Sequence, residues 1–154
     1  MLHSVPATAL EEFLKSVETA LLEDEARKPV KYSPHNIAPW SADQIDAENQ
    51  SLLNSVSNAA NVYAIFTAPK DSNEFTLQYI GKTTKKLARQ RIRNHLITKN
   101  EKTGAKLWKI ISHVQAGGAV KLSWVTVEPE SLRNYIEEEL INRHKEANWN
   151  RENA

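Results

Sequence analysis

The sequences VYAIF at residues 62–66 and LQYIGK at residues 77–82 decide the fold of this 154-residue chain. Both runs are rich in β-branched and aromatic residues, which favour strands. The intervening APKDSNE at residues 68–74 contains Pro, Asp, Ser and Asn, which favour turns. This pattern predicts a β-hairpin with a long loop, its strands covering residues 62–67 and 76–80.

Alternation along the first strand predicts its two faces. Residues two apart in a strand share a face, so Tyr63 and Ile65 should point one way while Val62, Ala64 and Phe66 point the other. We expect one face to pack and the other to display the phenol of Tyr63.

A glycine and a basic helix follow the hairpin. Gly81 is expected to end the second strand where the chain turns tightly or approaches a ligand closely. The run KTTKK at residues 82–86 then leads into a helix that begins near Leu87. Arg91 and His95 are four residues apart and therefore share a face of this helix. Its apolar side is expected to consist of Leu87, Ile92 and Leu96.

These features, in this order, resemble the GIY-YIG nuclease family. Its members combine a Tyr-bearing strand, a Tyr-Ile-Gly strand end, a helix with Arg and often His four residues later, and a distal helix with a metal-binding Glu. The distal helix here is NYIEEELI at residues 134–141, where the Glu three residues before Leu-Ile is Glu137. The pair Trp149-Asn150 matches the family's closing aromatic and Asn. The resemblance therefore runs from about residue 61 to residue 150.

Two departures from the family pattern are visible. The first motif reads NVY at residues 61–63, so its glycine is absent, and the hairpin loop is longer than in compact members. The matching tyrosine, Tyr63, is retained.

The resemblance implies metal-dependent hydrolysis of phosphodiester bonds in nucleic acid, with DNA as the expected substrate. The tyrosine that matches Tyr63 would take the proton of the attacking water, Arg91 would hold the scissile phosphate, and Glu137 would bind Mg²⁺ or Mn²⁺. Tyr79 and His95 would orient water or phosphate. The expected substrate-binding residues are Gly81, Lys82, Lys85, Lys86, Arg89 and Asn150. Lys82, the metal and Arg91 could favour the phenolate of Tyr63, and Asn150 could position Glu137 or backbone.

Composition limits the alternatives. The length suits one domain, the absence of cysteine excludes disulfides and thiolate metal sites, and no apolar run is long enough for a membrane span. No secretory signal is visible, so the cytoplasm is the expected location. The histidines outside the motif show no metal-ligand spacing, which argues against zinc. Two tryptophans, Trp108 and Trp124, are expected in the core.

The net charge of +1 conceals an asymmetry. Residues 1–57 hold nine acids and four bases, whereas residues 82–121 hold eleven bases and one acid. A basic block beside the motif favours contacts with a phosphate backbone, although a solvated helix face is the alternative for any single lysine. Lys99 and Lys102 are among the expected phosphate contacts.

The expected fold class is α/β (α+β): a small three-stranded antiparallel sheet flanked by helices, with two extra N-terminal helices. The two extra helices are expected at residues 9–22 and 41–59, joined by a proline-containing connection at residues 27–40. A further helix at residues 104–114, a third strand at 121–127 and a last helix beginning at Pro129 complete the prediction. We divide the chain into a helical extension at residues 1–60 and a nuclease domain at residues 61–152.

Two other functions stay open at this point. The chain could be a nucleic-acid-binding module that does not cut, although none of Tyr63, Arg91 and Glu137 is missing. It could also be a nuclease whose acidic N-terminal helices dock a protein partner or form a homodimer.

Overall fold

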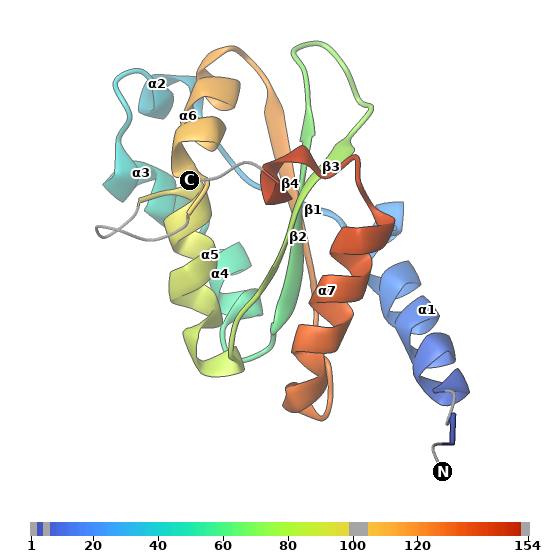
Figure 1. Ribbon diagram of the computed structural model, residues 1–154. Helices are drawn as coiled ribbons and strands as arrows, with labels where there is room; N and C mark the ends of the chain where they lie inside the picture. Colours follow the sequence, from blue (N-terminus) through green and yellow to red (C-terminus); the bar gives the residue numbers. More distant parts are fainter. Residues whose placement is uncertain (1–2, 5–6, 99–104, 152–154) are drawn as a thin grey trace.

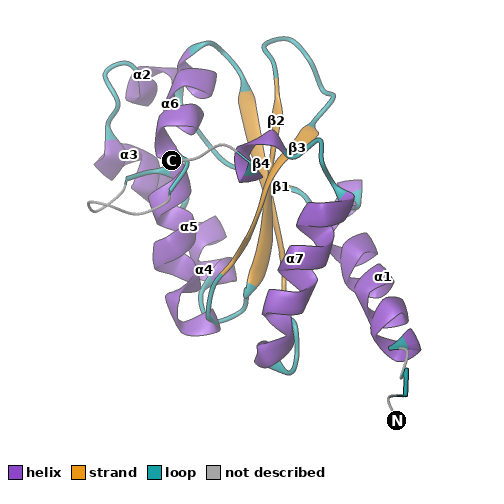
Figure 2. Ribbon diagram, viewed as in Figure 1, coloured by secondary structure: helices purple, strands orange, loops and turns teal. Residues whose placement is uncertain are grey.

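The structure is a computed structural model that describes residues 3–4, 7–98 and 105–151 (Figure 1). Its strands form one antiparallel sheet in the order β1-β4-β2-β3. Figure 2 shows this sheet between two groups of helices. The strands are β1 (Lys28–Pro29), β2 (Val62–Ala68), β3 (Thr76–Lys82) and β4 (Ala119–Val125). The predicted α/β fold class is confirmed.

The sheet has four strands, so the predicted three-stranded sheet was wrong by one edge strand. Lys28 and Pro29 pair with Leu122 and Lys121 of β4. A two-residue strand carries no periodicity, and its proline argued for a connection. At a sheet edge, however, proline is tolerated because its missing N–H is not needed by a second neighbour.

Most helices in the described ranges begin and end close to the predicted positions. The short helix at Pro34–Ile37, however, lies within the predicted connection at residues 27–40, and the last helix begins at Arg133, four residues after the predicted Pro129. The second N-terminal helix was predicted as one piece but is divided at Asn49. The Asn49 amide donates to the carbonyls of Lys31 and Ile45 and accepts from the Lys31 N–H, which fixes a non-helical backbone at this position. The predicted start of a later helix at Gly104 lies outside the described residues. The helices are α1 (Thr8–Leu22), α2 (Pro34–Ile37), α3 (Ala42–Glu48), α4 (Gln50–Val56), α5 (Ala88–Leu96), α6 (Leu107–Gln115) and α7 (Arg133–Arg143).

None of these helices, in the part of the chain that the structure describes, combines the length and apolar character that crossing a membrane requires.

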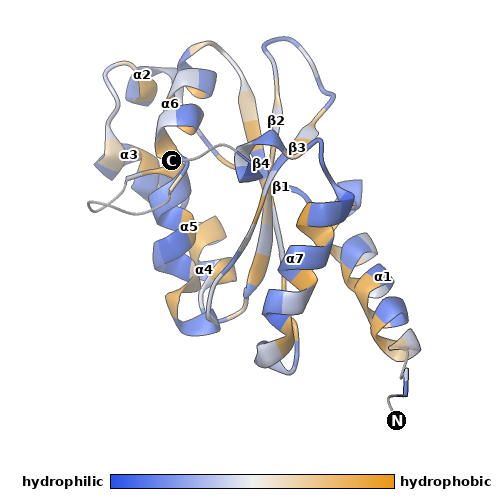
Figure 3. Cartoon of the chain, in the orientation of Figure 1, coloured by the Kyte–Doolittle hydropathy of each residue, from blue (hydrophilic) through white to orange (hydrophobic). Residues whose placement is uncertain are grey.

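Both faces of β2 are buried. Tyr63 and Ile65 belong to a core with residues of α3, α4, α5 and α6, whereas Val62, Ala64 and Phe66 pack with α1 and α7. Figure 1 shows these helix groups on opposite sides of the sheet, and Figure 3 shows the apolar central strand between them. The predicted alternation is thus confirmed. The prediction that one face displays the phenol of Tyr63 was wrong, because helices cover both faces of the strand.

A bulge in the hairpin turns Tyr79 toward Tyr63. Ile65 pairs with Tyr79 but Phe66 pairs with Leu77, so the pairing skips Gln78. Leu77 therefore packs with the α1 and α7 core, while Tyr79 packs with the core on the other face. Without this bulge at Gln78, the side chains of Leu77 and Tyr79, which are two residues apart, would share a face.

Candidate active site

Tyr63 is the centre of the site. Its side chain is almost wholly buried, with 1% of its surface exposed, and its hydroxyl lies 2.8 Å from Nε2 of His95. Gly81 is its partner across the β2–β3 ladder. A Cβ at Gly81 would lie 2.5 Å from both Cζ and Oη of Tyr63, so only glycine leaves room for the phenol.

This contact corrects the prediction for Gly81 in part. The expected close approach exists, but the approaching group is the ring of Tyr63. The strand does not end at Gly81, because β3 continues to Lys82.

The position of the proton on His95 follows from its hydrogen bonds. Nδ1 of His95 accepts from the backbone N–H of Lys106 at 3.0 Å, so a neutral ring carries its proton on Nε2. The Nε2–H then donates to the Tyr63 oxygen. Burial, together with the charges of Arg91 and Lys106, lowers the pKa of His95 to about 3, which keeps the imidazole neutral near neutral pH.

Tyr79 completes an aromatic cluster with these two residues. Its ring centroid lies 6.2 Å from that of Tyr63 and 5.1 Å from that of His95. The ammonium group of Lys106 lies 5.7 Å from the Tyr79 ring centroid. Tyr79 is only partly buried, so part of this residue is accessible to solvent.

Both phenols are held in the neutral form. Burial is the main cause that raises the pKa of Tyr63 well above its ordinary value; Tyr79 and Glu137 raise it further, and Arg91 opposes them. Burial and the charge of Glu137 raise the pKa of Tyr79, again against Arg91. The expectation that nearby cations favour a phenolate is therefore met by Arg91 but outweighed by burial in the free protein.

Glu137 lies on α7, and its charge acts on the phenols of Tyr63 and Tyr79. It also forms an ion pair with Lys82. Its Oε1 lies 3.3 Å from Nζ of Lys82, and 15% of its side chain is exposed. Burial raises the pKa of Glu137, whereas Lys82 lowers it. Among the described residues no three carboxylate or histidine groups cluster as a metal site. A single carboxylate that already faces a cation still fits Mg²⁺ or Mn²⁺, because such ions retain several waters and use substrate phosphate as a ligand.

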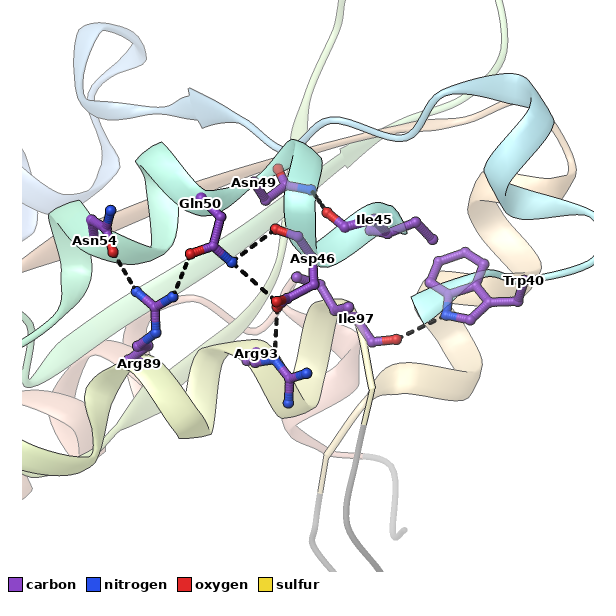
Figure 4. A network of polar contacts seen from close by, with 9 residues as sticks. All are labelled: Trp40, Ile45, Asp46, Asn49, Gln50, Asn54, Arg89, Arg93 and Ile97. Carbon is purple, nitrogen blue, oxygen red and sulfur yellow. Dashed lines mark hydrogen bonds and ion pairs between the residues drawn. The ribbon is translucent and has the colours of Figure 1, made fainter. Parts of the chain in front are cut away.

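Helix α5 presents two different basic faces. Arg91 is exposed and makes no hydrogen bond or ion pair with the described residues. Arg89 and Arg93 lie two positions away on either side, about 200° around the helix, and they face the N-terminal segment. Figure 4 shows Arg89 donating to Asn54 and Gln50, and Arg93 paired with Asp46. The geometry thus commits Arg89 to internal contacts, and its predicted role in substrate binding stays a prediction.

Among the other expected binding residues, the two lysines before α5 lie at the surface, whereas Asn150 makes internal contacts. Lys85 and Lys86 lie at the surface in the turn before α5, where the Lys85 N–H donates to Glu130. Both ends of the Asn150 amide bond to the backbone of Ile80 at 2.8 Å, which anchors β3 between Tyr79 and Gly81. Lys99 and Lys102 lie outside the described residues.

The structure adds two residues to the neighbourhood that no sequence spacing indicated. Lys106 fixes the His95 tautomer from a position eleven residues later in the sequence. Buried Asn61 stands where the family glycine is absent, and its amide bonds to both the N–H and the carbonyl of Val127, which ties the start of β2 to the segment that follows β4. The polar character of Asn61 was the only available signal.

Two hydrophobic residues are not where they were predicted. Trp108 has 71% of its surface exposed and Leu87 has 47%, so neither belongs to the core. Trp124 is partly buried and packs against the Tyr63 core. Leu87 lies in the turn Lys85–Leu87 that precedes α5, which removes it from the buried side of that helix.

Residues 59–153 match the family model described as the GIY-YIG catalytic domain. The match covers more than half of the chain and includes β2, β3, α5 and α7, which carry the clustered residues. No curated protein and no solved structure matches the chain.

Proposed function

The chain belongs to the GIY-YIG family, as its motifs predicted, and we propose that it is a metal-dependent endonuclease that hydrolyses phosphodiester bonds in DNA. The family implies nuclease activity on nucleic acid, and its nucleases are generally metal-dependent. DNA as the substrate, Mg²⁺ or Mn²⁺ as the ion and the individual residue roles are parts of the proposal.

One observation carries it: four elements bring the side chains for this chemistry to one place. The ring centroids of Tyr63 from β2, Tyr79 from β3 and His95 from α5 lie 5.1 to 6.2 Å from one another, and the charges of Arg91 from α5 and Glu137 from α7 act on the pKa of both phenols. An exposed arginine beside a buried phenol and a carboxylate suits phosphate binding next to a water that must lose a proton.

Glu137 would hold the divalent ion, whose charge neutralises phosphate oxygens and the departing alkoxide. Arg91 would bind the scissile phosphate through its planar fork, since it has solvent access and no competing partner among the described residues. Lys82, paired with Glu137 in the free protein, would remain beside the phosphate as a second positive charge.

Tyr63 would receive the proton of the attacking water as a phenolate, after its own phenolic proton has been released to solvent under the positive charges of Arg91, Lys82 and the ion that Glu137 would hold. His95 donates its Nε2–H to the Tyr63 oxygen, so this proton stabilises a negative oxygen and leaves its other lone pairs for water. Tyr79 would orient water or phosphate from the solvent side of the cluster.

The first test is cleavage of single-stranded DNA, duplex DNA, branched DNA and RNA by the purified protein, with and without Mg²⁺. Glu137→Ala should abolish cleavage and retain the fold and most substrate binding, because it removes only the proposed ion ligand. Glu138→Ala is the matched control, since Glu138 is the exposed neighbour on the same helix. Equal loss in both variants, or undiminished cleavage by Glu137→Ala, would contradict the assignment. Binding without cleavage by the wild type on every substrate would favour the non-cutting module.

A further inference from the structure

Arg133, the first residue of α7, has only part of its guanidinium group paired. Its Nη1 donates to the Glu130 carbonyl at 3.2 Å and lies 3.7 Å from the Glu130 carboxylate. Nε and Nη2 have no hydrogen-bond partner among the residues that the structure describes, and Nε is sealed from solvent. A buried donor without an acceptor costs free energy, so the contacts with Glu130 account for only one side of this group.

The unpaired side is the edge with which arginine binds oxyanions. Nε and Nη2 point to the same side of the planar group, as at Arg27, where both donate to the Leu22 carbonyl. Two N–H groups in this fork match two oxygens of one phosphate. The Arg133 side chain is 23% exposed, and of the two donors only Nε is sealed, so a ligand can reach this edge at Nη2.

Measured contacts place Arg133 beside the proposed site. The second carboxylate oxygen of Glu130 accepts the backbone N–H of Lys85 at 3.1 Å, and Lys82, three residues earlier, pairs with Glu137 at 3.3 Å. The segment between these two lysines therefore runs along the first two turns of α7, which packs against β3 (Figure 1). Arg133 and Glu137 are four residues apart, so they share a face of α7 and are separated by about 6 Å along its axis.

The surroundings of Arg133 favour an anion that arrives with the substrate. Of the two nearby acids, Glu130 already contacts Arg133 and the Lys85 N–H, and Glu137 already contacts Lys82. Neighbouring phosphates of a nucleic-acid strand are linked through a single sugar. A strand whose scissile phosphate lies at the ion that Glu137 would hold therefore brings a second phosphate within a short distance along α7.

We propose that Arg133 binds the backbone phosphate next to the one that is cut. The proposal rests on the proposed nuclease function and adds a substrate requirement: the strand must continue past the cleavage point on the side of α7. Phosphate contacts position a nucleic acid without reading its sequence, so this requirement holds for any base sequence. Arg133 is thus a substrate-binding residue, whereas Arg91 holds the scissile phosphate.

The test measures binding of two fluorescent DNA duplexes of unrelated sequence, in metal-free buffer, at a series of salt concentrations. Arg133→Gln should weaken binding of both duplexes roughly tenfold or more at low salt and reduce the slope of log affinity against log salt by about 0.9. Arg133→Lys keeps the charge but loses the fork, so it should keep the wild-type slope and bind less tightly. Arg143→Gln removes the same charge from the far end of α7, where Arg143 pairs with Glu11, and should change neither quantity.

An unchanged salt slope in Arg133→Gln would overturn the proposal, because Arg133 would then only stabilise the start of α7. Equal losses in Arg133→Gln and Arg143→Gln, or a loss confined to one duplex, would also overturn it. Thermal unfolding shows whether Arg133→Gln folds; if it does not, wild-type affinity of Arg133→Lys would be the contradicting result.

Adding Mg²⁺ separates this proposal from the nuclease function. Binding that depends on Arg133, without cleavage of any nucleic acid by the wild type, would contradict the nuclease proposal alone. Cleavage by the wild type, with binding that does not depend on Arg133, would contradict the phosphate contact alone.

Discussion

Tyr63 and Gly81 lie opposite each other in the β2–β3 hairpin, and the position of the Tyr63 ring accounts for the glycine at position 81. The Tyr63 ring occupies the space that any side chain at position 81 would fill. The glycine of the second motif is therefore a requirement of the phenol that the first motif supplies. Hydrogen bonds through His95 to the Lys106 N–H then fix the direction in which the phenol oxygen can act.

Gly81→Ala should therefore disable the site without removing the substrate surface. The new methyl group must displace the Tyr63 ring, because the clash involves its Cζ and Oη atoms, and the hydrogen bond to His95 would be lost. We expect cleavage to fall on the order of 10²–10⁴-fold, the range for loss of a general base. Steady-state kinetics and DNA binding measure this. Thr76→Ala, at the far end of the same strand, is the control; similar activity of the two variants would show that the Tyr63 position is unimportant.

Arg91→Lys tests the phosphate clamp. Lysine retains the charge but loses the bidentate fork, so we expect cleavage to fall about 100-fold or more with little change in thermal stability. Arg89→Lys is the matched variant on the same helix. Because Arg89 bonds to Asn54 and Gln50, its change should lower the melting temperature and spare the chemical step. The reverse pattern would exchange the roles of the two arginines.

At the scale of elements, the N-terminal segment determines where α5 lies. Tyr32 and Trp40 donate to the carbonyls of Leu96 and Ile97 at the end of α5, at 2.7 and 2.8 Å. The network in Figure 4 holds the same helix through Arg89 and Arg93. These bonds satisfy carbonyl groups that a helix end leaves without partners. The acidic residue in these contacts, Asp46, pairs internally with Arg93, and docking of a protein partner or a homodimer on the N-terminal helices stays a prediction.

Tyr32→Phe should loosen α5, the helix that carries the proposed site residues Arg91 and His95, at its C-terminal end. It leaves the Leu96 carbonyl without its donor, at a cost of about 1–3 kcal/mol in the free energy of unfolding. Because α5 carries Arg91 and His95, we also expect a lower kcat with a smaller change in KM. Chemical denaturation and kinetics measure both quantities. Ser55→Ala removes an exposed helix hydrogen bond and is the control; an equal loss of stability there would mean that the Tyr32 bond has no special part.

At the scale of the whole molecule, the two halves share one core. Ile45, Leu53 and Val56 from the N-terminal part pack with Tyr63 and Ile65 of the nuclease motif. On the other face, α1 packs with α7 and their surfaces are joined by ion pairs. The division at residues 60 and 61 stays a prediction, and the shared core leads us to expect that residues 61–154 alone would lose much of their stability.

The contact between α1 and α7 should respond to pH. Burial alone would lower the pKa of His144, but hydrogen bonds and charges of Glu18 and Glu146 raise it above its ordinary value of about 6.5. A raised pKa means that the charged pair stabilises the fold fully below about pH 6.5, and that this contribution is lost as the pH rises through the folded-state value.

We therefore expect the melting temperature of the wild type, relative to His144→Gln, to fall as the pH rises from about 6 to 8.5. Thermal unfolding at a series of pH values measures this difference. Comparing the two proteins cancels the opposite contribution of His95, whose lowered pKa destabilises the fold as the pH falls below about 6.5. A constant difference across the range would contradict a charged His144 in the folded protein.

The order of the strands and helices around the site could be predicted from the sequence, because it depends on local patterns. Alternation in residues 62–66, turn residues in the loop and the four-residue spacing of Arg91 and His95 each act within a few positions. The motif order from Tyr63 to Glu137 also identified the family, since residue types in order suffice for a resemblance.

What depended on contacts between distant segments was decided by the tertiary structure alone. The edge strand β1 exists only because β4 offers it a partner, and the bulge at Gln78 is defined by pairing with β2. Burial of Tyr63, exposure of Trp108 and the internal partners of Arg89 follow from which helix covers which surface. A linear pattern carries residue type and spacing, whereas burial and pairing depend on residues brought together by folding; for that reason the sequence determined the motif and its order, and the tertiary structure decided the environment of each side chain.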